Sequence, residues 1–533
     1  MAAPTATKSM LLRASRVWVS RCVGSRVRRI LSNPPQRNPE KTRNHRNQHD
    51  HQRAEPRADF PRLVDTEHHA HGRGHEQQGF GDPHRAILAR LRRRRTLASL
   101  RTMTHIPLQR TAILSLVSLA IVAAGALAYA ASPRTFTAED EALYQQRFEK
   151  LVAGMRYGLG LETYEPLERV EGDPRSRPLA AVTPGQGSIE ASALEQARDY
   201  ARNNNSIAFM VWRNGRVESA DYFKDFKPGE TFASRSLAKP MTAVAVGRAI
   251  ALGKIRSLDQ PVADFVTEWQ GDPRRSKILV RHLLDMRSGF LPQAPATTQE
   301  DMLNRAYLHP RHDEIIIHDY PVVDEPGTIY EYNNATSELV AVLIERATGM
   351  RYGEFLSREV LKKIGSPGGE IWVNRPGGVA HAGCCLMLQP EAWLRLGILL
   401  MQDGRWQGKR LLPEGYVNEM RRGTVHNPYY GLGVYVAERY TARRGFANPA
   451  REPEARRVLH SEPYLAEDLF LFDGNANQVV YVIPSENMVV LRVGNNPPRA
   501  AGREWDNAVL PNTLMRGIRR AAGETAPRPQ PRD

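Results

Sequence analysis

The chain has 533 residues, of which 41% are hydrophobic and 25% are charged, so it has the size and composition of a protein with at least one ordinary folded domain. Its net charge of +16 is uneven, because residues 1–102 contain 22 Lys and Arg against 8 Asp and Glu, whereas the remainder carries a net charge of only +2. A uniformly basic, nucleic-acid-binding body is therefore excluded.

Residues 1–102 are rich in Arg, His, Pro, Gln and Asn and lack apolar periodicity, which predicts a disordered segment. A nucleic-acid-binding arm or a transit peptide is the alternative interpretation. A further interpretation is that this segment is translated upstream sequence and no part of the native protein, because Met103 is followed at once by the pattern of an export signal.

Residues 103–132 have the features of a signal peptide or an N-terminal membrane anchor. The 22 residues of 111–132 carry no charge, a length that can cross about 30 Å of hydrocarbon. Arg110 lies before this run and the acidic residues 139–141 lie after it, which predicts that the body of the protein is translocated. Residues 128–130 form an Ala-x-Ala cleavage pattern. We therefore expect an exported protein, either periplasmic or anchored in the inner membrane and facing the periplasm.

The rest of the chain is predicted to contain a lead-in or linker at 133–185, one domain at 186–525 and a disordered tail at 526–533. Alternating apolar residues around Asn214-Gly215 predict a hairpin. A second hairpin and four helices are also predicted, the hairpin at 478–483 and 488–493 and the helices at 237–252, 339–348, 391–402 and 506–521. This order indicates an α+β fold, an antiparallel β-sheet with helices on both faces plus a mostly helical subdomain.

Ser236 and Lys239 form a Ser-x-x-Lys motif at the predicted start of a helix. Positions i and i+3 lie on one helix face, so the Lys239 amine can reach the Ser236 hydroxyl. Pro240 is tolerable only in the first helical turn, which puts Ser236 at the helix N-terminus, where the partial positive charge favours a developing oxyanion. An N-capping serine beside a solvated lysine is the alternative interpretation.

Two further polar motifs follow later in the chain. Tyr332 can relay a proton, and Asn334 can hold both a lysine and a substrate carbonyl through hydrogen bonds. Gly474 allows a close approach to backbone, and the N–H of Asn475 can then face the nucleophile. Each motif alone is also compatible with an ordinary loop.

The order and spacing of these motifs resemble the serine β-lactamase and penicillin-binding-protein superfamily, in particular the class C-like branch of carboxylesterases and 6-aminohexanoate-dimer hydrolases. The resemblance covers about residues 186–515. It implies that Ser236 is the acylated nucleophile, that Lys239 is the neighbouring base, and that Tyr332 and Asn334 are the Tyr-x-Asn motif.

One motif departs from the family pattern. Where the family has Lys-Thr-Gly or His-x-Gly, this chain has Phe472-Asp473-Gly474. The cation that faces an antibiotic carboxylate is missing, and we expect the Asp473 charge to disfavour such a ligand, so little β-lactam hydrolysis is expected.

These features predict an exported serine hydrolase that cleaves an ester, amide or peptide bond of a small molecule, with Lys239 or Tyr332 as the general base. Asn334, Gly474 and the N–H of Asn475 would bind substrate and oxyanion. No cofactor or metal is predicted, because no Cys/His cluster has metal-ligand spacing. The adjacent Cys384 and Cys385 are a poor pair for bridging and are expected to be packed thiols.

Three alternatives remain: a cell-wall D-amino-acid peptidase, a β-lactamase, or a non-catalytic penicillin-binding-like module. The expected partners are the substrate and, if residues 111–132 are retained, a membrane; no nucleic acid is expected for the folded domain.

Overall fold

The computed structural model describes residues 134–156, 161, 163–293, 298–445, 457–498 and 503–532. All of them belong to the second of two units into which the chain divides, Thr111–Asp533. The predicted basic segment (1–102) and the predicted signal or anchor (103–132) lie outside the described residues. Within the described ranges, no helix combines the length and the apolar character needed to cross a membrane.

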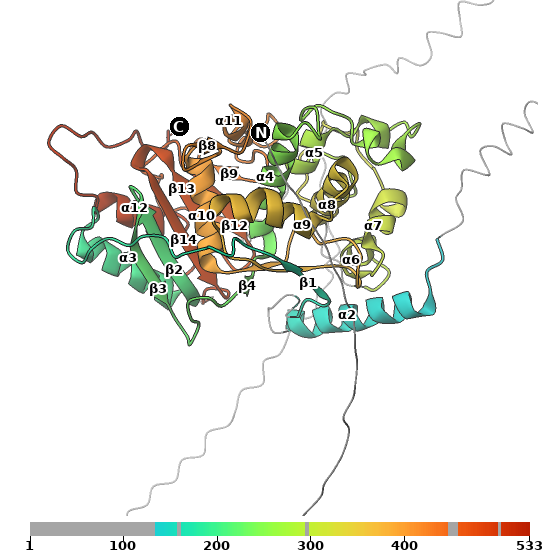
Figure 1. Ribbon diagram of the computed structural model, residues 1–533, viewed down its shortest axis with the longest axis horizontal. Helices are drawn as coiled ribbons and strands as arrows, with labels where there is room; N and C mark the ends of the chain where they lie inside the picture. The colour runs from blue at the N-terminus through green and yellow to red at the C-terminus, as the bar shows by residue number, and fades with distance from the viewer. Residues whose placement is uncertain are drawn as a thin grey trace, which may run out of the picture. The chain divides into compact units, whose positions relative to one another are not determined.

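A six-stranded antiparallel sheet forms one half of the described fold (Figure 1). Its strands are, in spatial order, β3 (Arg216–Tyr222), β2 (Ser206–Arg213), β14 (Met488–Gly494), β13 (Gln478–Ile483), β12 (Phe470–Gly474) and β9 (Tyr435–Val436). Both predicted hairpins are present, and Asn214 and Gly215 adopt the positive φ angles that a tight hairpin turn requires.

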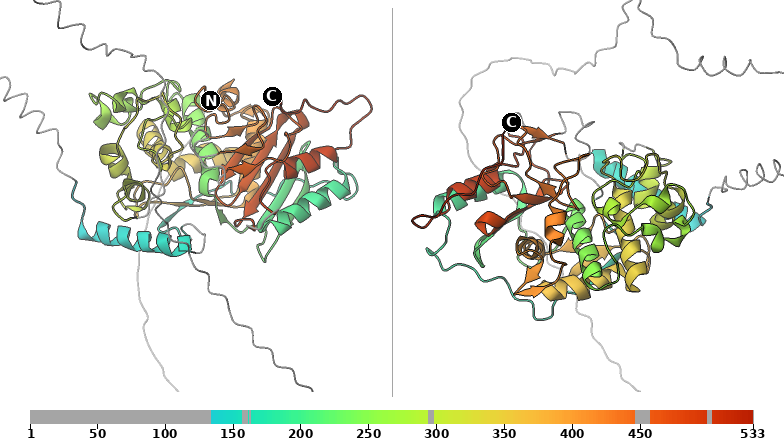
Figure 2. Two further views of the ribbon diagram at one scale, coloured as in Figure 1. Left: turned by 180° about the vertical axis from the view of Figure 1, so that it is seen from behind. Right: turned by 90° about the horizontal axis from the view of Figure 1, so that it is seen from above.

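Helices cover both faces of this sheet, as predicted, and its central strands are buried on both sides (Figure 2). Alternate residues of β13 face opposite cores: Val479 and Tyr481 join the core under α3 (Ala191–Asn203) and α12 (Val509–Arg516), whereas Val480 joins the core on the other face. That second face is covered by α10 (Pro390–Met401) and α4 (Ala238–Ala251).

A smaller antiparallel sheet positions the segments that matter for function. Its strands are, in spatial order, β1 (Leu167–Val170), β5 (Gly369–Trp372), β6 (Leu386–Leu388) and β4 (Phe232–Ala233). β4 leads into the Ser236 turn, and β6 begins three residues after Gly383. The pairing of Phe232 with Leu388 and Ala233 with Met387 therefore fixes these two segments against each other.

The other half is mostly helical, in agreement with the predicted helical subdomain (Figures 1 and 2). Its helices are α2 (Ala138–Arg156), α5 (Val280–Leu284), α6 (Met302–Leu308), α7 (His312–Glu314), α8 (Asn334–Thr348) and α9 (Tyr352–Leu356). Among the described residues, the remaining α-helix is α11 (Tyr416–Met420). Two further antiparallel pairs of short strands are formed by β7 (Arg405–Trp406) with β8 (Lys409–Arg410) and by β10 (Arg443–Arg444) with β11 (Val458–Leu459).

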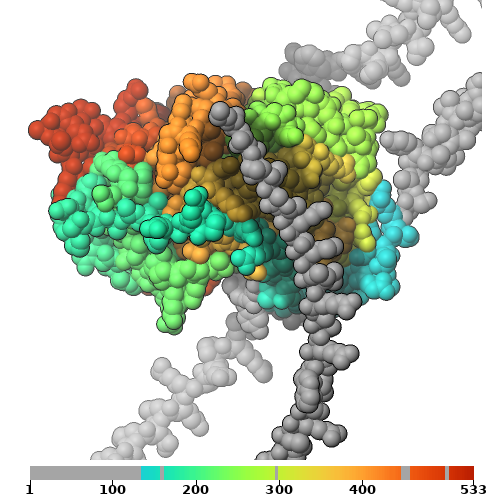
Figure 3. Space-filling view, viewed as in Figure 1, coloured from blue at the N-terminus to red at the C-terminus, as the bar shows by residue number. Residues whose placement is uncertain are grey.

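The stretch predicted as a linker, 133–185, is instead an integral part of the fold over its described residues. In α2, the buried Arg147 donates hydrogen bonds to the carbonyls of Leu308, Glu165 and Asn374. β1 then pairs with β5, and the segment that follows lies flat on the surface in the space-filling view (Figure 3). The prediction was wrong because a high content of Pro, Glu and Arg also suits a segment that docks through its backbone and long polar side chains.

The expected disordered tail, 526–533, is also docked over its described residues. Gln530 is buried, exchanges hydrogen bonds with the backbone of Tyr464 and donates its side-chain amide to the carbonyl of Ala437. A segment whose only apolar residues are Ala and Pro can thus be held in place by backbone and amide hydrogen bonds, which sequence hydropathy does not detect.

Candidate active site

Ser236 lies in a single 3-10 turn, Arg235–Leu237, between β4 and the first residue of α4. It is half-buried, whereas the flanking Ser234 and Leu237 are buried. Pro240 falls in the first turn of α4, as predicted, where its missing N–H costs no helical hydrogen bond. The Ser236 hydroxyl therefore lies at the N-terminus of a 14-residue helix, in a field that favours negative charge.

The start of β13 and the end of β12 hold this turn in place. The buried side-chain amide of Gln478 donates hydrogen bonds to the carbonyls of Ala233 and Ser234, at 3.1 and 3.2 Å. Gly474 packs so closely that a Cβ placed there would lie 3.0 Å from the Leu237 nitrogen. A larger residue at position 474 would therefore press on the backbone of the nucleophile turn.

Lys239 is 2% exposed, and its Nζ atom has three polar neighbours. It lies 3.1 Å from Ser236 Oγ, 2.9 Å from Asn334 Oδ1 and 3.1 Å from the carbonyl oxygen of Gly383. The structure thus brings Asn334 into contact with the Ser236–Lys239 motif, although Asn334 and Lys239 lie 95 residues apart in the sequence.

The chemistry of these neighbours restricts what a neutral amine can do. The oxygens of Asn334 and Gly383 are acceptors only, so they occupy the two N–H bonds that a neutral lysine has. The third neighbour, the Ser236 hydroxyl, is the only one that can donate. The lone pair of a neutral Lys239 is therefore directed at the proton of Ser236.

Tyr332 contacts Lys239 through its ring and not through its hydroxyl. The Nζ atom lies 4.7 Å from the ring centroid, a cation–π arrangement. Asn333, between the two predicted residues, caps α8 by accepting from the Thr336 N–H and donates to the carbonyl of Leu291. This cap points Tyr332 and Asn334 to the side of α8 that Lys239 approaches.

Asn475 lies in the turn between β12 and β13, where its exposed side chain accepts from the N–H of Ala476. Asp473 does not project toward the nucleophile. Gly474 faces the turn of Ser236, so the preceding side chain points to the opposite face of the sheet.

On that face the carboxyl of Asp473 lies near Tyr435, Tyr464 and Tyr481, and burial raises its pKa to about 8. The expected repulsion of a substrate carboxylate by Asp473 is therefore wrong. The sequence identified the strand that carries Asp473, but it did not show on which face of the sheet the side chain lies or that the carboxyl keeps its proton.

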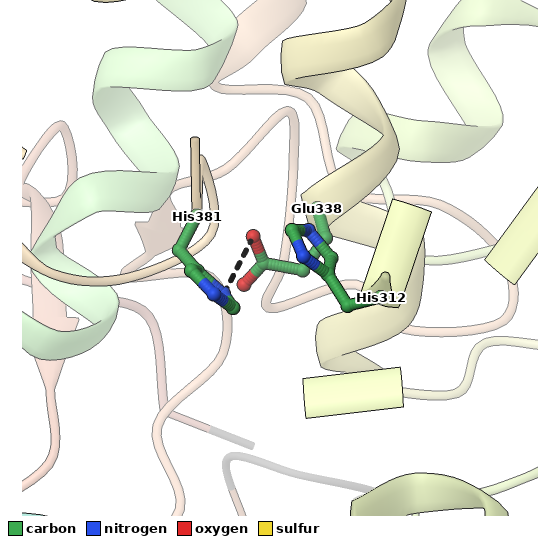
Figure 4. A group of neighbouring side chains, drawn as sticks. All are labelled: His312, Glu338 and His381. Atoms are coloured by element: carbon green, nitrogen blue, oxygen red, sulfur yellow. Dashed lines mark ion pairs between the residues drawn. The ribbon is translucent and has the colours of Figure 1, made fainter. Parts of the chain in front are cut away.

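Behind Lys239, three buried side chains gather around the middle of α8: His312, Glu338 and His381 (Figure 4). Their possible ligand atoms lie within 4.8 Å of one another, and neither imidazole has a hydrogen-bond partner among the described residues. However, the two imidazole rings are stacked at 4.2 Å with only 17° between their planes.

A metal ion binds an imidazole nitrogen in the plane of the ring at about 2 Å. Two nearly parallel planes one ring thickness apart do not meet at such a point, so the cluster does not fit a shared ion. His381 is also stacked on Trp372 at 3.5 Å, which holds it in this orientation.

Cys384 and Cys385 form a disulfide, which corrects the expectation of two packed thiols. In an extended strand, adjacent side chains point to opposite faces. Cys385 instead has a φ of +68°, a left-handed conformation that breaks this alternation. The bridged pair lies immediately after Gly383, and the hydroxyl of Tyr307 lies 3.1 Å from the Cys384 sulfur.

Two groups of the Lys239 environment were not predicted from the sequence: the carbonyl of Gly383 and the side chain of Glu338. A carbonyl acceptor leaves no signature in the sequence, because every residue has one. Glu338 follows Asn334 by one helical turn, so its position on the same face was available as a signal. In contrast, His282 and His460 have structural roles, since both are buried and hydrogen-bonded to backbone or to tyrosine.

Comparison with known proteins supports the same interpretation. The family model described as "Beta-lactamase" matches residues 191–512. The 6-aminohexanoate-dimer hydrolase of Paenarthrobacter ureafaciens is 26% identical over 228 residues, which are 40% of this chain and 57% of the relative. The chain thus spans little more than half of that protein.

Among solved structures, that of a proposed 6-aminohexanoate-dimer hydrolase from Bacillus anthracis superposes with a TM-score of 0.51 and 18% identity. The match covers 70% of this chain and 93% of that one. This likeness confirms the predicted α+β fold. With a family model that covers most of the chain, this protein belongs to the β-lactamase family of serine hydrolases.

Proposed function

We propose that this protein hydrolyses amide or ester bonds through an acyl-enzyme on Ser236, with Lys239 as the general base. The observation that carries the proposal is the placement of Lys239 Nζ, whose two obligate acceptors leave only Ser236 Oγ to share a proton with it. A non-catalytic module would have no use for a buried amine directed at a half-exposed hydroxyl.

The reaction begins when Ser236 Oγ attacks the substrate carbonyl carbon while its proton passes to Lys239. The carbonyl π electrons move onto the oxygen, which is held by the N–H groups of Ser236 and Asn475. Collapse of this intermediate breaks the bond to the amine or alcohol, which leaves with the proton from Lys239. Water then attacks the acyl-enzyme with Lys239 again as base, which releases the acid and restores Ser236.

The ring of Tyr332 supports this role of Lys239. When Lys239 accepts the proton it becomes a cation, and the face of an aromatic ring at 4.7 Å favours that cation over the neutral amine. The contact through the ring favours Lys239 over Tyr332 as the base. The Tyr332 hydroxyl stays available to donate a hydrogen bond to the leaving group, which takes its proton from Lys239.

We propose small linear amides as the substrate class. The support is the name of the relative, a 6-aminohexanoate-dimer hydrolase, together with the absence of a cation in the Phe472-Asp473-Gly474 triplet. A β-lactamase or cell-wall peptidase would acylate with penicillin. Labelling by a fluorescent penicillin therefore separates these alternatives from the proposed amidase or esterase.

The test is turnover of p-nitrophenyl butyrate and of 6-aminohexanoate dimer by the full-length protein and by Ser236→Ala. We expect Ser236→Ala to abolish both activities and to block labelling by a fluorophosphonate. Ser234→Ala is the matched control, because Ser234 directly precedes the same turn but its hydroxyl accepts from the N–H of Leu386. Turnover that survives in Ser236→Ala would rule out Ser236 as the nucleophile.

We further propose that residues 103–132 direct export, on the strength of their uncharged run alone. N-terminal sequencing of the native protein and fractionation of cells test this. A protein that begins upstream of Met103 and stays in the cytoplasm would contradict it.

A further inference from the structure

We infer that Glu338 is a positioning residue that acts through the general base: its charge sets the protonation of Lys239 across the backbone of Gly383. This inference rests on the proposed function. The three acceptors that touch Lys239 Nζ are all uncharged, so none of them balances an ammonium. Glu338 is a carboxyl that is 1% exposed, and its charge interacts with that of Lys239.

The connection runs through one peptide segment. The N–H of Gly383 points to Glu338 Oε2 at 3.5 Å, and the carbonyl of the same residue accepts from Lys239 at 3.1 Å. Glu338 also lies one helical turn after Asn334 on α8, so the helix that supplies one acceptor for Lys239 also supplies the buried carboxyl.

Close packing makes this arrangement rigid. A Cβ placed on Gly383 would lie 2.1 Å from Ser337 Oγ and 3.2 Å from Glu338 Oε1, so the segment is seated directly on α8. On the far side, the carboxylate of Glu338 is directed to His381, with Nδ1 at 3.7 Å from Oε2 (Figure 4). A change of charge at Glu338 therefore acts across a short, solvent-free path.

Five titratable or charged groups face Glu338: Lys239 from α4, Tyr307 from α6, His312 from α7, Tyr352 from α9 and His381 from the segment before β6. Burial lowers the pKa of His312 to about 3 and that of His381 well below its usual range, so both are neutral near pH 7. Burial raises the pKa of both tyrosines above their usual value.

Burial likewise raises the pKa of Glu338, to about 7. The two imidazoles are thus neutral near pH 7, whereas Glu338 itself changes charge in the range where a hydrolase works. An ionised Glu338 favours the protonated amine and thus opposes its function as a base. Removal of that charge makes Lys239 lose its proton at lower pH.

The experiment is the pH profile of kcat/KM for p-nitrophenyl butyrate with the full-length protein. Glu338→Gln keeps the size and an acceptor oxygen but removes the charge. We expect its acidic limb to move down by roughly one pH unit, as for a unit charge several ångströms away at an effective dielectric constant near 20. Glu338→Asp keeps the charge, so the acidic limb of its kcat/KM profile should stay near that of the wild type, while kcat falls.

Glu345→Gln is the matched control. It makes the same substitution further along α8, at a partly buried glutamate that accepts from the N–H of Tyr352, and we expect it to leave the profile unchanged. Identical acidic limbs in wild type, Glu338→Gln and Glu338→Asp would overturn the inference, as would an equal shift in Glu345→Gln. Fluorophosphonate labelling of Ser236 in each variant separates this outcome from a failure of the proposed function, which would show as loss of labelling in all of them.

Discussion

Gly383→Ala tests whether the contact between Gly383 and Lys239 matters, because it changes the position of a carbonyl without replacing any polar side chain. The new Cβ would lie 2.1 Å from Ser337 Oγ and 2.9 Å from Ser337 Cβ. Rotation of the serine hydroxyl relieves the first contact but not the second. The segment must therefore move away from α8.

The size of the effect follows from these distances. An ordinary carbon contact begins near 3.4 Å, so relief of the remaining 2.9 Å contact with Ser337 Cβ requires a shift of about 0.5 Å. Such a shift is enough to break the 3.1 Å hydrogen bond from Lys239 to the Gly383 carbonyl. Overpacking costs about 1–3 kcal/mol of stability, and loss of a hydrogen bond to a charged group is worth about 1.5–3 kcal/mol, or roughly 10- to 100-fold in rate.

The assay is kcat/KM for p-nitrophenyl butyrate together with the thermal unfolding midpoint. Ser337→Gly removes both clashing atoms, so the double variant Gly383→Ala, Ser337→Gly should recover activity more fully than stability, since glycine inside a helix costs about 1 kcal/mol. Ser337→Gly alone completes the double-mutant cycle. Wild-type activity in Gly383→Ala, or no recovery in the double variant, would refute the reasoning.

Three further predictions concern neighbouring groups. Asn334→Asp puts a carboxylate against Lys239, which favours the ammonium, so the acidic limb of the kcat/KM profile should move to higher pH; an unmoved limb would argue against Lys239 as the base. Gln478→Ala removes the two hydrogen bonds that its amide donates to the carbonyls of Ala233 and Ser234, so kcat/KM should fall about 10-fold or more and stability by about 1–3 kcal/mol in urea unfolding. Burial raises the pKa of Asp473 to about 8, so the native state holds a proton that the unfolded chain releases near pH 4, and stability should fall as pH rises across this window. Asp473→Asn should flatten that fall between pH 5 and pH 8, and an equal slope in both proteins would show that Asp473 is not its source.

What the sequence determined by itself is mostly local. The Asn214-Gly215 turn, the first-turn Pro240 and the end of α8 at Thr348, where Gly349 follows with a positive φ, each depend on the conformational preference of one or two residues, and all three are in the predicted places. The helical spacing of Ser236 and Lys239 is local in the same sense, so their hydrogen bond was predictable before any tertiary contact was known.

Only the tertiary structure decided which groups surround that pair. The Gly383 carbonyl lies 144 residues from Lys239, and it arrives there because of the register in which β4 pairs with β6. The face on which Asp473 lies, its protonation and the docking of residues 526–532 likewise depend on burial by distant segments. A sequence pattern reports what a residue prefers, whereas the partner of a buried polar group is fixed by the packing of elements far apart in the chain.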